Sequence, residues 1–197
     1  MDKNERCKVK GRAGFKTGAL AGVIIGVLLG VLTYQAGVGY ACPSRNCVGS
    51  AEVTPVADRE YFQAARDVLA GAEETIHIVS FEVKYYRSYP DSLQNQLVRE
   101  LIYARERGVE VRVIVDEFSE SDNAYDLLKA NGVDIRHDGK ETTTHCKLII
   151  VDGKVVLLGS TNLSYYGLEK NHEANVKIVD RRTAEYYEEY FRQLWGE

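Results

Sequence analysis

Five polar side chains with the chemistry of a catalytic site lie within 18 residues of one another. They are His145, Lys147, Asp152, Ser160 and Asn162. A histidine can act as a nucleophile or transfer a proton, a lysine carries positive charge, and hydroxyl and amide groups donate hydrogen bonds. This set suits a phosphoryl group, because a cation and fixed donors can stabilise its developing charge without a metal ion.

Two apolar runs determine where these side chains must lie. Residues 148–151 and 155–158 are short, partly β-branched and separated by an Asp-Gly turn signal, so we expect a hairpin of buried strands. Side chains two residues apart on a strand point to the same face, so His145 and Lys147 should share one strand end. The return strand ends in the small-residue turn 159–162, which would bring its hydroxyl and amide groups to the same place.

The spacing of these residues is H-x-K-x4-D-x6-G-S-x-N. It resembles the signature of the phospholipase D superfamily, and every position of that signature is filled. The resemblance covers about residues 54–195 and is strongest from His145 to Glu173. It implies a phospholipase D-like fold and the cleavage of phosphodiesters in two steps, without a metal ion or another cofactor.

The resemblance also implies a role for each residue. His145 would attack phosphorus and form a phosphohistidine, while a second histidine protonates the leaving oxygen and later activates water. Lys147 and Asn162 would hold the non-bridging oxygens, with Ser160 as a further substrate-binding group at the same turn. Glu173 resembles the downstream acid that orients the nucleophilic histidine in small members of the family.

Asp152 belongs to the motif and is counted with its catalytic residues, but it lies at the far end of the first strand from His145. We therefore expect its carboxylate to have a structural role around the turn rather than to contact phosphate. The chain carries one copy of the motif, whereas larger relatives carry two. This implies a two-fold homodimer in which the two His145 side chains face each other across the axis.

The overall composition is that of a chain with one sizeable domain core: 197 residues, of which 45% are hydrophobic. The net charge of -4 is unevenly spread. Residues 1–40 carry six Lys/Arg and two Asp/Glu, and the remainder carries 19 Lys/Arg and 27 Asp/Glu. An acidic net charge after residue 40 is not typical of a protein that binds nucleic acid tightly and non-specifically, although a local basic cleft is still compatible with it.

The amino-terminal region has the pattern of a membrane segment. Residues 1–17 form a basic tail, and residues 18–40 carry no charge and are long enough to cross a bilayer as a helix. The basic flank would keep the amino end cytoplasmic and place the catalytic domain outside. The alternative is a signal sequence cleaved after Ala41, which would make the protein secreted or periplasmic. Glycines at every fourth position from Gly14 to Gly30 favour pairing of two such helices.

Residues 41–53 are expected to form a linker that contains two of the four cysteines. If this segment lies outside the cytoplasm, Cys42 and Cys47 could close a small disulfide loop; the alternative is two free thiols. Cys146 lies beside the motif histidine but on the opposite strand face. We expect it to be a small buried residue rather than a nucleophile.

Residues 54–197 alternate between helical and strand patterns, which predicts an α/β domain with a mixed sheet covered by helices on both faces. The helices are expected at 54–70, 91–107, 121–130 and from 183 onward, and the strands at 75–83, 109–115, 133–136, 173–179 and in the hairpin. In the last helix, the residues expected to face inward are Tyr187, Tyr190, Phe191 and Leu194.

Three further histidines lie outside the signature. His77 alternates with isoleucines in a predicted strand and should be packed, while His137 and His172 could line the cleft or lie on the surface. The sequence contains no compact metal-binding pattern, so we expect no metal ion. Residues 84–89 are basic and aromatic; they could contact phosphates and stack bases, meet a lipid headgroup, or form an ordinary solvated loop.

Together these features predict a phosphodiesterase, and the first hypothesis is a nuclease acting on DNA or RNA. Compact single-motif chains with a secretory leader resemble the bacterial endonucleases of the family. The alternative is a phospholipase D acting on a membrane phospholipid such as cardiolipin, which agrees with a membrane-tethered site. A third hypothesis is a non-catalytic phosphate-binding membrane protein, but the intact His145 and Lys147 argue against it.

Overall fold

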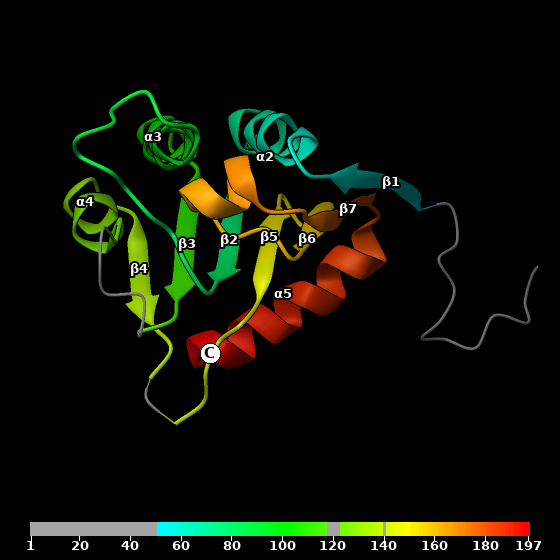
Figure 1. Cartoon of the computed structure of the whole chain (residues 1–197). Helices are drawn as coiled ribbons and strands as arrows, with labels where there is room; N and C mark the ends of the chain where they lie inside the picture. The colour runs from blue at the N-terminus through cyan, green and yellow to red at the C-terminus, as the bar shows by residue number, and fades with distance from the viewer. Residues whose placement is uncertain (1–50, 118–122, 140) are drawn as a thin grey trace, which may run out of the picture. The chain divides into compact units, whose positions relative to one another are not determined.

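The structure is a computed structural model that describes residues 51–117, 123–139 and 141–197 (Figure 1). The helices are α2 (Glu60–Ala70), α3 (Leu93–Glu106), α4 (Tyr125–Ala130), the π-helix η1 (Tyr166–Lys170) and α5 (Arg181–Trp195). The strands are β1 (Glu52–Ala57), β2 (Thr75–Ser80), β3 (Glu110–Val115), β4 (Asp134–His137), β5 (Lys147–Val151), β6 (Val155–Gly159) and β7 (Ala174–Val179). The predicted α/β class with a mixed sheet is confirmed.

The strands form one seven-stranded sheet in the order β1-β7-β6-β5-β2-β3-β4. Neighbours among β2, β3 and β4 are parallel, and every other neighbouring pair is antiparallel. The predicted hairpin of β5 and β6 is present, and all five residues of β5 are buried. The start of β5 lies beside the carboxyl end of β2, where Ser80 pairs with Lys147. The motif residues are thus placed at the edge where the parallel strands end.

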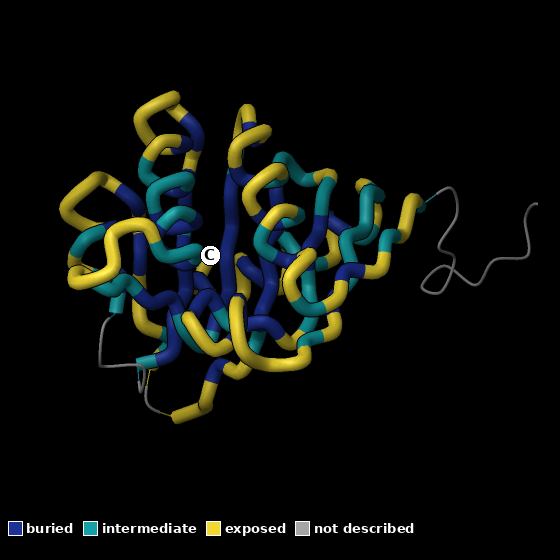
Figure 2. Tube along the Cα trace, turned by 45° about the horizontal axis from the view of Figure 1, so that its top comes forward, coloured by how far each residue is buried: buried dark blue, intermediate teal, exposed yellow. Residues whose placement is uncertain are grey.

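The two faces of the sheet carry separate apolar cores. On one face, α2, α3 and η1 cover a large core that includes Leu69, Leu101 and Leu168 (Figure 1). On the other face, α5 packs through Phe191 and Trp195 onto the central strands. Figure 2 shows the buried trace concentrated in the central strands, with exposed residues on the outer turns of the helices.

The first predicted helix begins later than expected. Residues 52–57 form the edge strand β1, which pairs antiparallel with β7, and the helix starts only at Glu60. Pro55 favoured a helix start in the sequence, but a proline is equally compatible with an edge strand, where its missing N–H leaves no hydrogen bond unmade. The chain turns from strand to helix at Asp58, whose φ of 48° is left-handed.

The last helix was predicted at the right place but with part of its inward face wrong. Ala184, Phe191 and Trp195 are its buried residues. Tyr190 and Leu194 are 37% and 41% exposed. Trp195, four residues after Phe191, takes the inward position, because residues i and i+4 share one helix face.

Several element boundaries also differ from the predicted ones. The residue before α3 is Ser92 rather than Asp91, and η1 was not anticipated. The helix α4 begins at Tyr125, within the range predicted for it. No helix among the described residues is long and apolar enough to cross a membrane. The expected anchor or signal sequence at 18–40, the basic tail before it and the Cys42–Cys47 pair all lie outside the described residues.

Candidate active site

The motif histidine lies on a short segment that is held at both sides before β5 begins. The backbone N–H of Thr144 donates to the buried carboxylate of Asp116 over 2.9 Å, and the N–H of Phe81 donates to the carbonyl of Cys146 over 3.0 Å. Asp116 follows β3 and Phe81 follows β2, so the carboxyl ends of both parallel strands position the segment. This fixes the backbone on either side of His145.

His145 and Lys147 both lie close to one aromatic ring, that of Phe81. The imidazole centroid is 5.0 Å from the centroid of Phe81, and the Lys147 Nζ is 5.2 Å from the same centroid. The ammonium also donates to the carbonyl oxygen of His145 over 3.0 Å. His145 is exposed, whereas Lys147 is only 8% exposed. The site therefore presents an accessible imidazole next to a largely buried cation.

Burial of Lys147 has an electrostatic consequence. Removal from water disfavours the charged ammonium and lowers the pKa of Lys147 below its ordinary value. Nearby acidic groups, Glu82 and Glu173 among them, act in the opposite direction. A partly desolvated cation interacts more strongly with an incoming anion than a fully hydrated one does.

The turn after β6 is built by a residue that the sequence did not single out. Asn175 on β7 accepts hydrogen bonds through Oδ1 from the N–H groups of Ser160 and Thr161, over 3.1 and 3.2 Å. Its Nδ2 donates to Thr161 Oγ1 over 2.9 Å. A Cβ at Gly159 would lie 2.2 Å from the Asn175 Oδ1, so only glycine fits there. The glycine of the motif is thus required by the close approach of β7.

The side chains of Ser160 and Asn162, which follow this turn, differ in their hydrogen bonding. The Ser160 hydroxyl donates to Glu173 Oε2 and accepts from the N–H of Ala174 over 3.1 Å. The Asn162 Oδ1 is buried and has no hydrogen-bond partner among the described residues. Ser160 is therefore committed to the protein, whereas the amide of Asn162 is available to a ligand.

Glu173 is held within the same cluster but does not contact the imidazole. Its Oε1 accepts from Asn171 Nδ2 over 2.9 Å, and its N–H donates to Asp58 Oδ1 over 2.7 Å. That backbone hydrogen bond, together with one to His172, lowers the pKa of Asp58. No hydrogen bond joins the His145 ring to Glu173 or to another described residue of this chain.

Asp152 lies at the opposite end of β5 from Lys147. Its carboxylate accepts from three successive backbone N–H groups, with Oδ1 at 2.8 Å from Glu74 N and 2.9 Å from Thr75 N and Oδ2 at 3.1 Å from Glu73 N. Asp152 and Gly153 both have φ of 53°, the conformation of a tight hairpin turn. The structure agrees with a structural role for Asp152 and does not bring it together with the other motif residues. Its bonds reach the start of β2 rather than the turn itself.

His172 is exposed, with Nδ1 3.0 Å from Asp58 Oδ2 at the edge of this cluster, whereas the side chains of His77, His137 and Cys146 make no hydrogen bond within it. His77 is buried, stacks on Phe191 and has Nδ1 2.6 Å from Glu188 Oε2, as expected for a packed residue. His137 stacks on Tyr125, while the Sγ of the half-buried Cys146 lies 3.5 Å from Tyr190 Oη. Within the described residues, no group of three or more His, Cys, Asp or Glu side chains could hold a metal ion. Metal-independent chemistry stays a prediction.

Comparison with known proteins decides the family. Residues 66–195 match the family described as Cardiolipin synthase, PLD-like domain, which is 130 of the 197 residues. The chain belongs to the phospholipase D superfamily. This phospholipase D-like chain is 38% identical over 104 residues to the mitochondrial cardiolipin hydrolase of Xenopus tropicalis, covering 51% of this chain and 49% of that protein. It is 33% identical over 119 residues to a phospholipase D of Rickettsia prowazekii, covering 59% and 53%.

The solved structures that resemble the phospholipase D-like domain share its fold at lower identity. The phospholipase D family member Nuc of Salmonella typhimurium has a TM-score of 0.65 at 23% identity and covers 75% of this chain and 95% of its own. NucT of Helicobacter pylori has a TM-score of 0.63 at 18% identity, covering 75% and 97%. The chain thus spans about half the length of the relatives matched by sequence and nearly all of these two structures.

Proposed function

We propose that this protein hydrolyses phosphodiesters through a phosphohistidine formed on His145, in an active site shared by two copies of the chain. The observation that carries the proposal is the set of side chains that lie near the start of β5 and the end of β6. There, an exposed imidazole lies beside the buried Lys147 ammonium, and the Oδ1 of the neighbouring Asn162 amide has no partner among the described residues. The imidazole matches a nucleophile, and the donors to phosphoryl oxygens are the Lys147 ammonium and the NH2 group of the Asn162 amide.

The first step transfers the phosphoryl group to the protein. A ring nitrogen of His145 attacks phosphorus, and the bond from phosphorus to the leaving oxygen breaks. His145 of the partner subunit, in its protonated form, donates a proton to that oxygen, which leaves as an alcohol. The ammonium of Lys147 and the amide of Asn162 stabilise the charge on the non-bridging oxygens.

The second step releases the phosphoryl group to water. The imidazole that has just lost its proton takes one from a water molecule, whose oxygen attacks phosphorus as the phosphorus–nitrogen bond breaks. Both histidines are thereby returned to their starting states. One imidazole cannot serve at once as nucleophile and as proton donor, which is why a chain with a single motif requires a second copy.

Glu173 would orient His145 in this dimer. Within one chain its carboxylate bonds Ser160 and Asn171 rather than the nucleophile. The orienting contact to His145 that the family resemblance implies would therefore form only when two chains meet. Pairing of the glycine-rich segments at 18–40 would raise the effective concentration of the two catalytic domains.

For the substrate, we propose nucleic acid. Support comes from residues 84–89, where exposed Arg87 and Tyr89 lie on a loop that is fixed by Asn95, whose amide bonds the backbone of Tyr86 and Tyr89. Positive charge together with exposed aromatic rings, on which bases can stack, is typical of proteins that bind single-stranded nucleic acid.

The alternative substrate is a membrane phospholipid. Matched relatives are named for cardiolipin hydrolysis and phospholipase D activity, and a membrane-anchored catalytic domain would place the site near lipid. In either case we propose a single-pass anchor with the catalytic domain outside the cytoplasm, or a secreted or periplasmic enzyme if the leader is removed.

The proposal is tested with the full chain and a phosphodiester that carries neither base nor lipid. In EDTA, bis(p-nitrophenyl) phosphate should be hydrolysed by the wild-type protein and not by His145→Ala. His137→Ala, at an exposed histidine that stacks on Tyr125, is the matched control and should retain activity. Turnover that depends on added metal, or that survives in His145→Ala, would refute the mechanism.

A further inference from the structure

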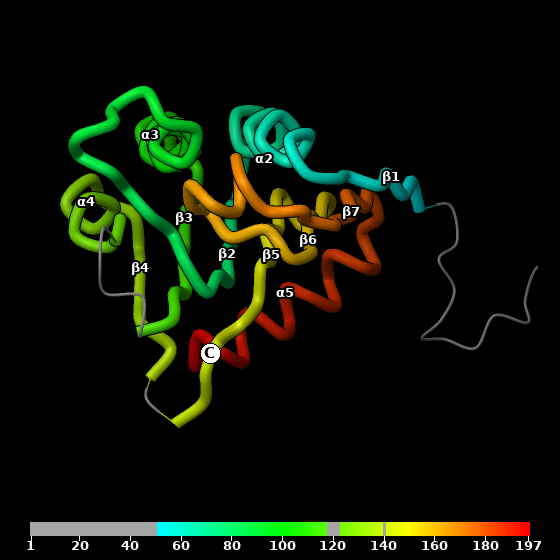
Figure 3. Tube along the Cα trace, in the orientation of Figure 1, coloured from blue at the N-terminus to red at the C-terminus, as the bar shows by residue number. Residues whose placement is uncertain are grey.

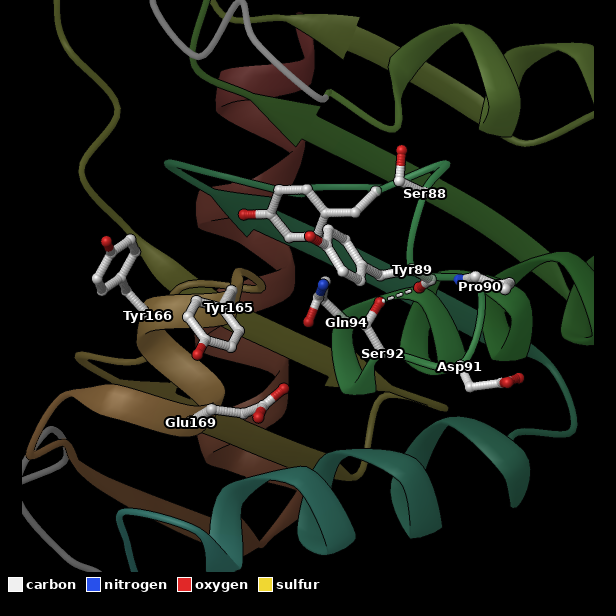
Figure 4. Close-up of a pocket in the computed structure, with 10 residues that line it drawn as sticks. Ser88, Tyr89, Pro90, Asp91, Ser92, Gln94, Tyr165, Tyr166 and Glu169 are labelled. Atoms are coloured by element: carbon white, nitrogen blue, oxygen red, sulfur yellow. Dashed lines mark hydrogen bonds between the residues drawn. The ribbon is translucent and has the colours of Figure 1, made fainter.

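A tyrosine-rich pocket opens beside the catalytic segment. It has a volume of about 760 Å³ and lies between the loop 86–92 and η1. Four tyrosines line it, two from each side: Tyr86, Tyr89, Tyr165 and Tyr166 (Figure 4). Three of these rings are open to solvent, since Tyr89 is 69%, Tyr166 66% and Tyr165 36% exposed. Exposed aromatic rings facing one cavity are an arrangement for binding a flat ligand between them.

Both walls of the pocket continue from segments that build the catalytic site. In Figure 3, the loop after β2 and the segment after β6 run next to each other in front of the sheet. They are joined where Leu163 N donates to Glu82 O over 3.2 Å and Lys84 N donates to Leu163 O over 2.9 Å. From Asn162 to Tyr165 is three residues, so their backbones are at most about 11 Å apart. A polymeric substrate held at Asn162 would reach the pocket within a short distance.

The two walls are also rigidly tied. Asn95 is fully buried and holds the loop through three hydrogen bonds to the backbone of Tyr86 and Tyr89. On the other side, η1 packs so closely on the catalytic turn that a Cβ at Gly167 would lie 2.3 Å from the carbonyl oxygen of Asn162. The pocket is therefore positioned by the same backbone that carries the phosphate-binding amide.

Between the tyrosines lies an unsatisfied acceptor. Gln94 is 1% exposed, and its Oε1 is buried without a hydrogen-bond partner among the described residues. Figure 4 shows its side chain between Tyr89 and Tyr165. A buried amide oxygen without a partner is unfavourable, so a ligand that brings an N–H donor to it would be bound selectively.

The charges and side-chain types of the lining narrow the ligand further. Asp91 and Glu169 are its charged residues, and neither Lys nor Arg contributes to the described lining. This disfavours a second phosphate or an anionic lipid headgroup. The lining also contains no Leu, Ile, Val or Met side chain, which disfavours an acyl chain. A flat, neutral group that donates hydrogen bonds fits these constraints.

We propose that the pocket binds one base of a single-stranded nucleic acid whose scissile phosphate lies at His145, and that it prefers bases with an exocyclic amino group. The tyrosine faces stack on the base, and Gln94 Oε1 accepts from the amino group. Glu169 lies on the same wall as Tyr165 and provides a second acceptor. This inference rests on the proposed phosphodiesterase function and adds to its proposed nucleic-acid substrate a base that the pocket selects.

The test measures binding without turnover. The full chain carrying His145→Ala is titrated at fixed ionic strength with short single-stranded oligonucleotides of dC, dA or dT. We expect dC and dA to bind about fivefold more tightly than dT, the effect of one hydrogen bond to an otherwise unpaired acceptor. Gln94→Leu should abolish that difference. Tyr89→Ala should weaken binding of all three by about tenfold through lost stacking.

Two further variants keep the test decisive. Tyr103→Ala removes a tyrosine that is 48% exposed on α3 but outside the pocket, and it should change neither affinity nor preference. If Gln94→Leu fails to fold, Tyr166→Ala, at an exposed ring, replaces it and should weaken binding as Tyr89→Ala does.

Three results would overturn the inference or separate it from the function on which it rests. Equal affinity for the three oligonucleotides with no effect of Tyr89→Ala would exclude a base pocket. Binding to cardiolipin vesicles that depends on Tyr89, without oligonucleotide binding, would assign the pocket to lipid. If the oligonucleotides bind as expected but the wild-type protein does not hydrolyse bis(p-nitrophenyl) phosphate, the proposed hydrolysis fails while the base pocket stands.

Discussion

The two ends of the β5–β6 hairpin use the polar residues of one motif for opposite purposes. At the turn end, the Asp152 carboxylate accepts from three backbone N–H groups and is fully occupied by the protein. At the other end, the imidazole of His145 is exposed and the amide oxygen of Asn162 has no partner among the described residues. The motif thus contains residues that build the fold and residues left available for a ligand, and only the hydrogen-bond partners distinguish them.

Loss of the nucleophile should have the largest effect at the available end. His145→Ala removes the group on which the phosphoryl intermediate forms, so turnover of bis(p-nitrophenyl) phosphate should fall by at least about 10⁴-fold. Its side chain is exposed and makes no hydrogen bond to another described residue, so the thermal unfolding midpoint should hardly change. A variant that keeps measurable turnover would remove His145 from the chemistry.

Asn162→Ala should come next, because it removes a donor to the charge that develops on phosphorus. The expected loss in kcat is about 10²- to 10³-fold, comparable to the loss of one oxyanion donor in other enzymes. Stability should change little, since Asn162 Oδ1 makes no hydrogen bond within the described chain. A large drop in the unfolding midpoint, together with unchanged kcat, would mean that Asn162 is structural like Asp152.

Asp152→Ala is the matching test at the other end of the hairpin. Three backbone N–H groups would lose their acceptor, so we expect a loss of about 2 kcal/mol in the free energy of unfolding. The kcat of the folded protein should stay within about fivefold of wild type, because β5 separates the carboxylate from the site. Urea titration and single-substrate kinetics measure the two quantities. A kcat loss as large as that of Asn162→Ala would erase the distinction between the two ends.

The smallest effect is expected in the pH profile. Burial lowers the pKa of Lys147, so its ammonium loses the proton at a lower pH than an ordinary lysine, whose pKa is 10.5. Because phosphate binding needs the charged form, oligonucleotide affinity in the His145→Ala background, where the histidine proton donor is absent, should fall on the alkaline side before pH 10.5. Lys147→Arg in the same background keeps the charge and should move this decline to higher pH, even if the maximal affinity is lower. An alkaline decline that is identical in Lys147→Arg would belong to another group.

The hairpin and the identity of the reactive groups could be predicted from the sequence because their determinants are local. The two apolar runs, the polar residues around them and the Asp-Gly turn are all contained in 18 residues. The contacts that hold the site are not local. Asn175 bonds Ser160 from 15 residues away, and Asp116 bonds Thr144 from 28 residues away. An asparagine in a strand and an aspartate after one carry no signal of such partners.

Pairing across the sheet explains the other differences. Residues 52–57 have a proline and a short apolar pattern compatible with either state, and only the edge of β7 decides for a strand. The aromatic stretch at 84–89 indicated one wall of the tyrosine pocket from the sequence, but the second wall comes from Tyr165 and Tyr166. Nothing in the sequence pattern brings these two segments together; the bridge between Val83 and Leu163 does.

The central claim is that two copies of His145 act on one phosphorus atom. It is tested most directly by the stoichiometry of the covalent intermediate, measured by quenching turnover with denaturant at alkaline pH, where the phosphorus–nitrogen bond is stable, and by mass spectrometry of the peptide that contains His145. The account predicts a phosphohistidine on His145 at no more than one phosphoryl group per two chains, with a dimer seen by sedimentation under the same conditions. Labelling of one phosphoryl group per chain, or full activity in a monomer, would contradict it.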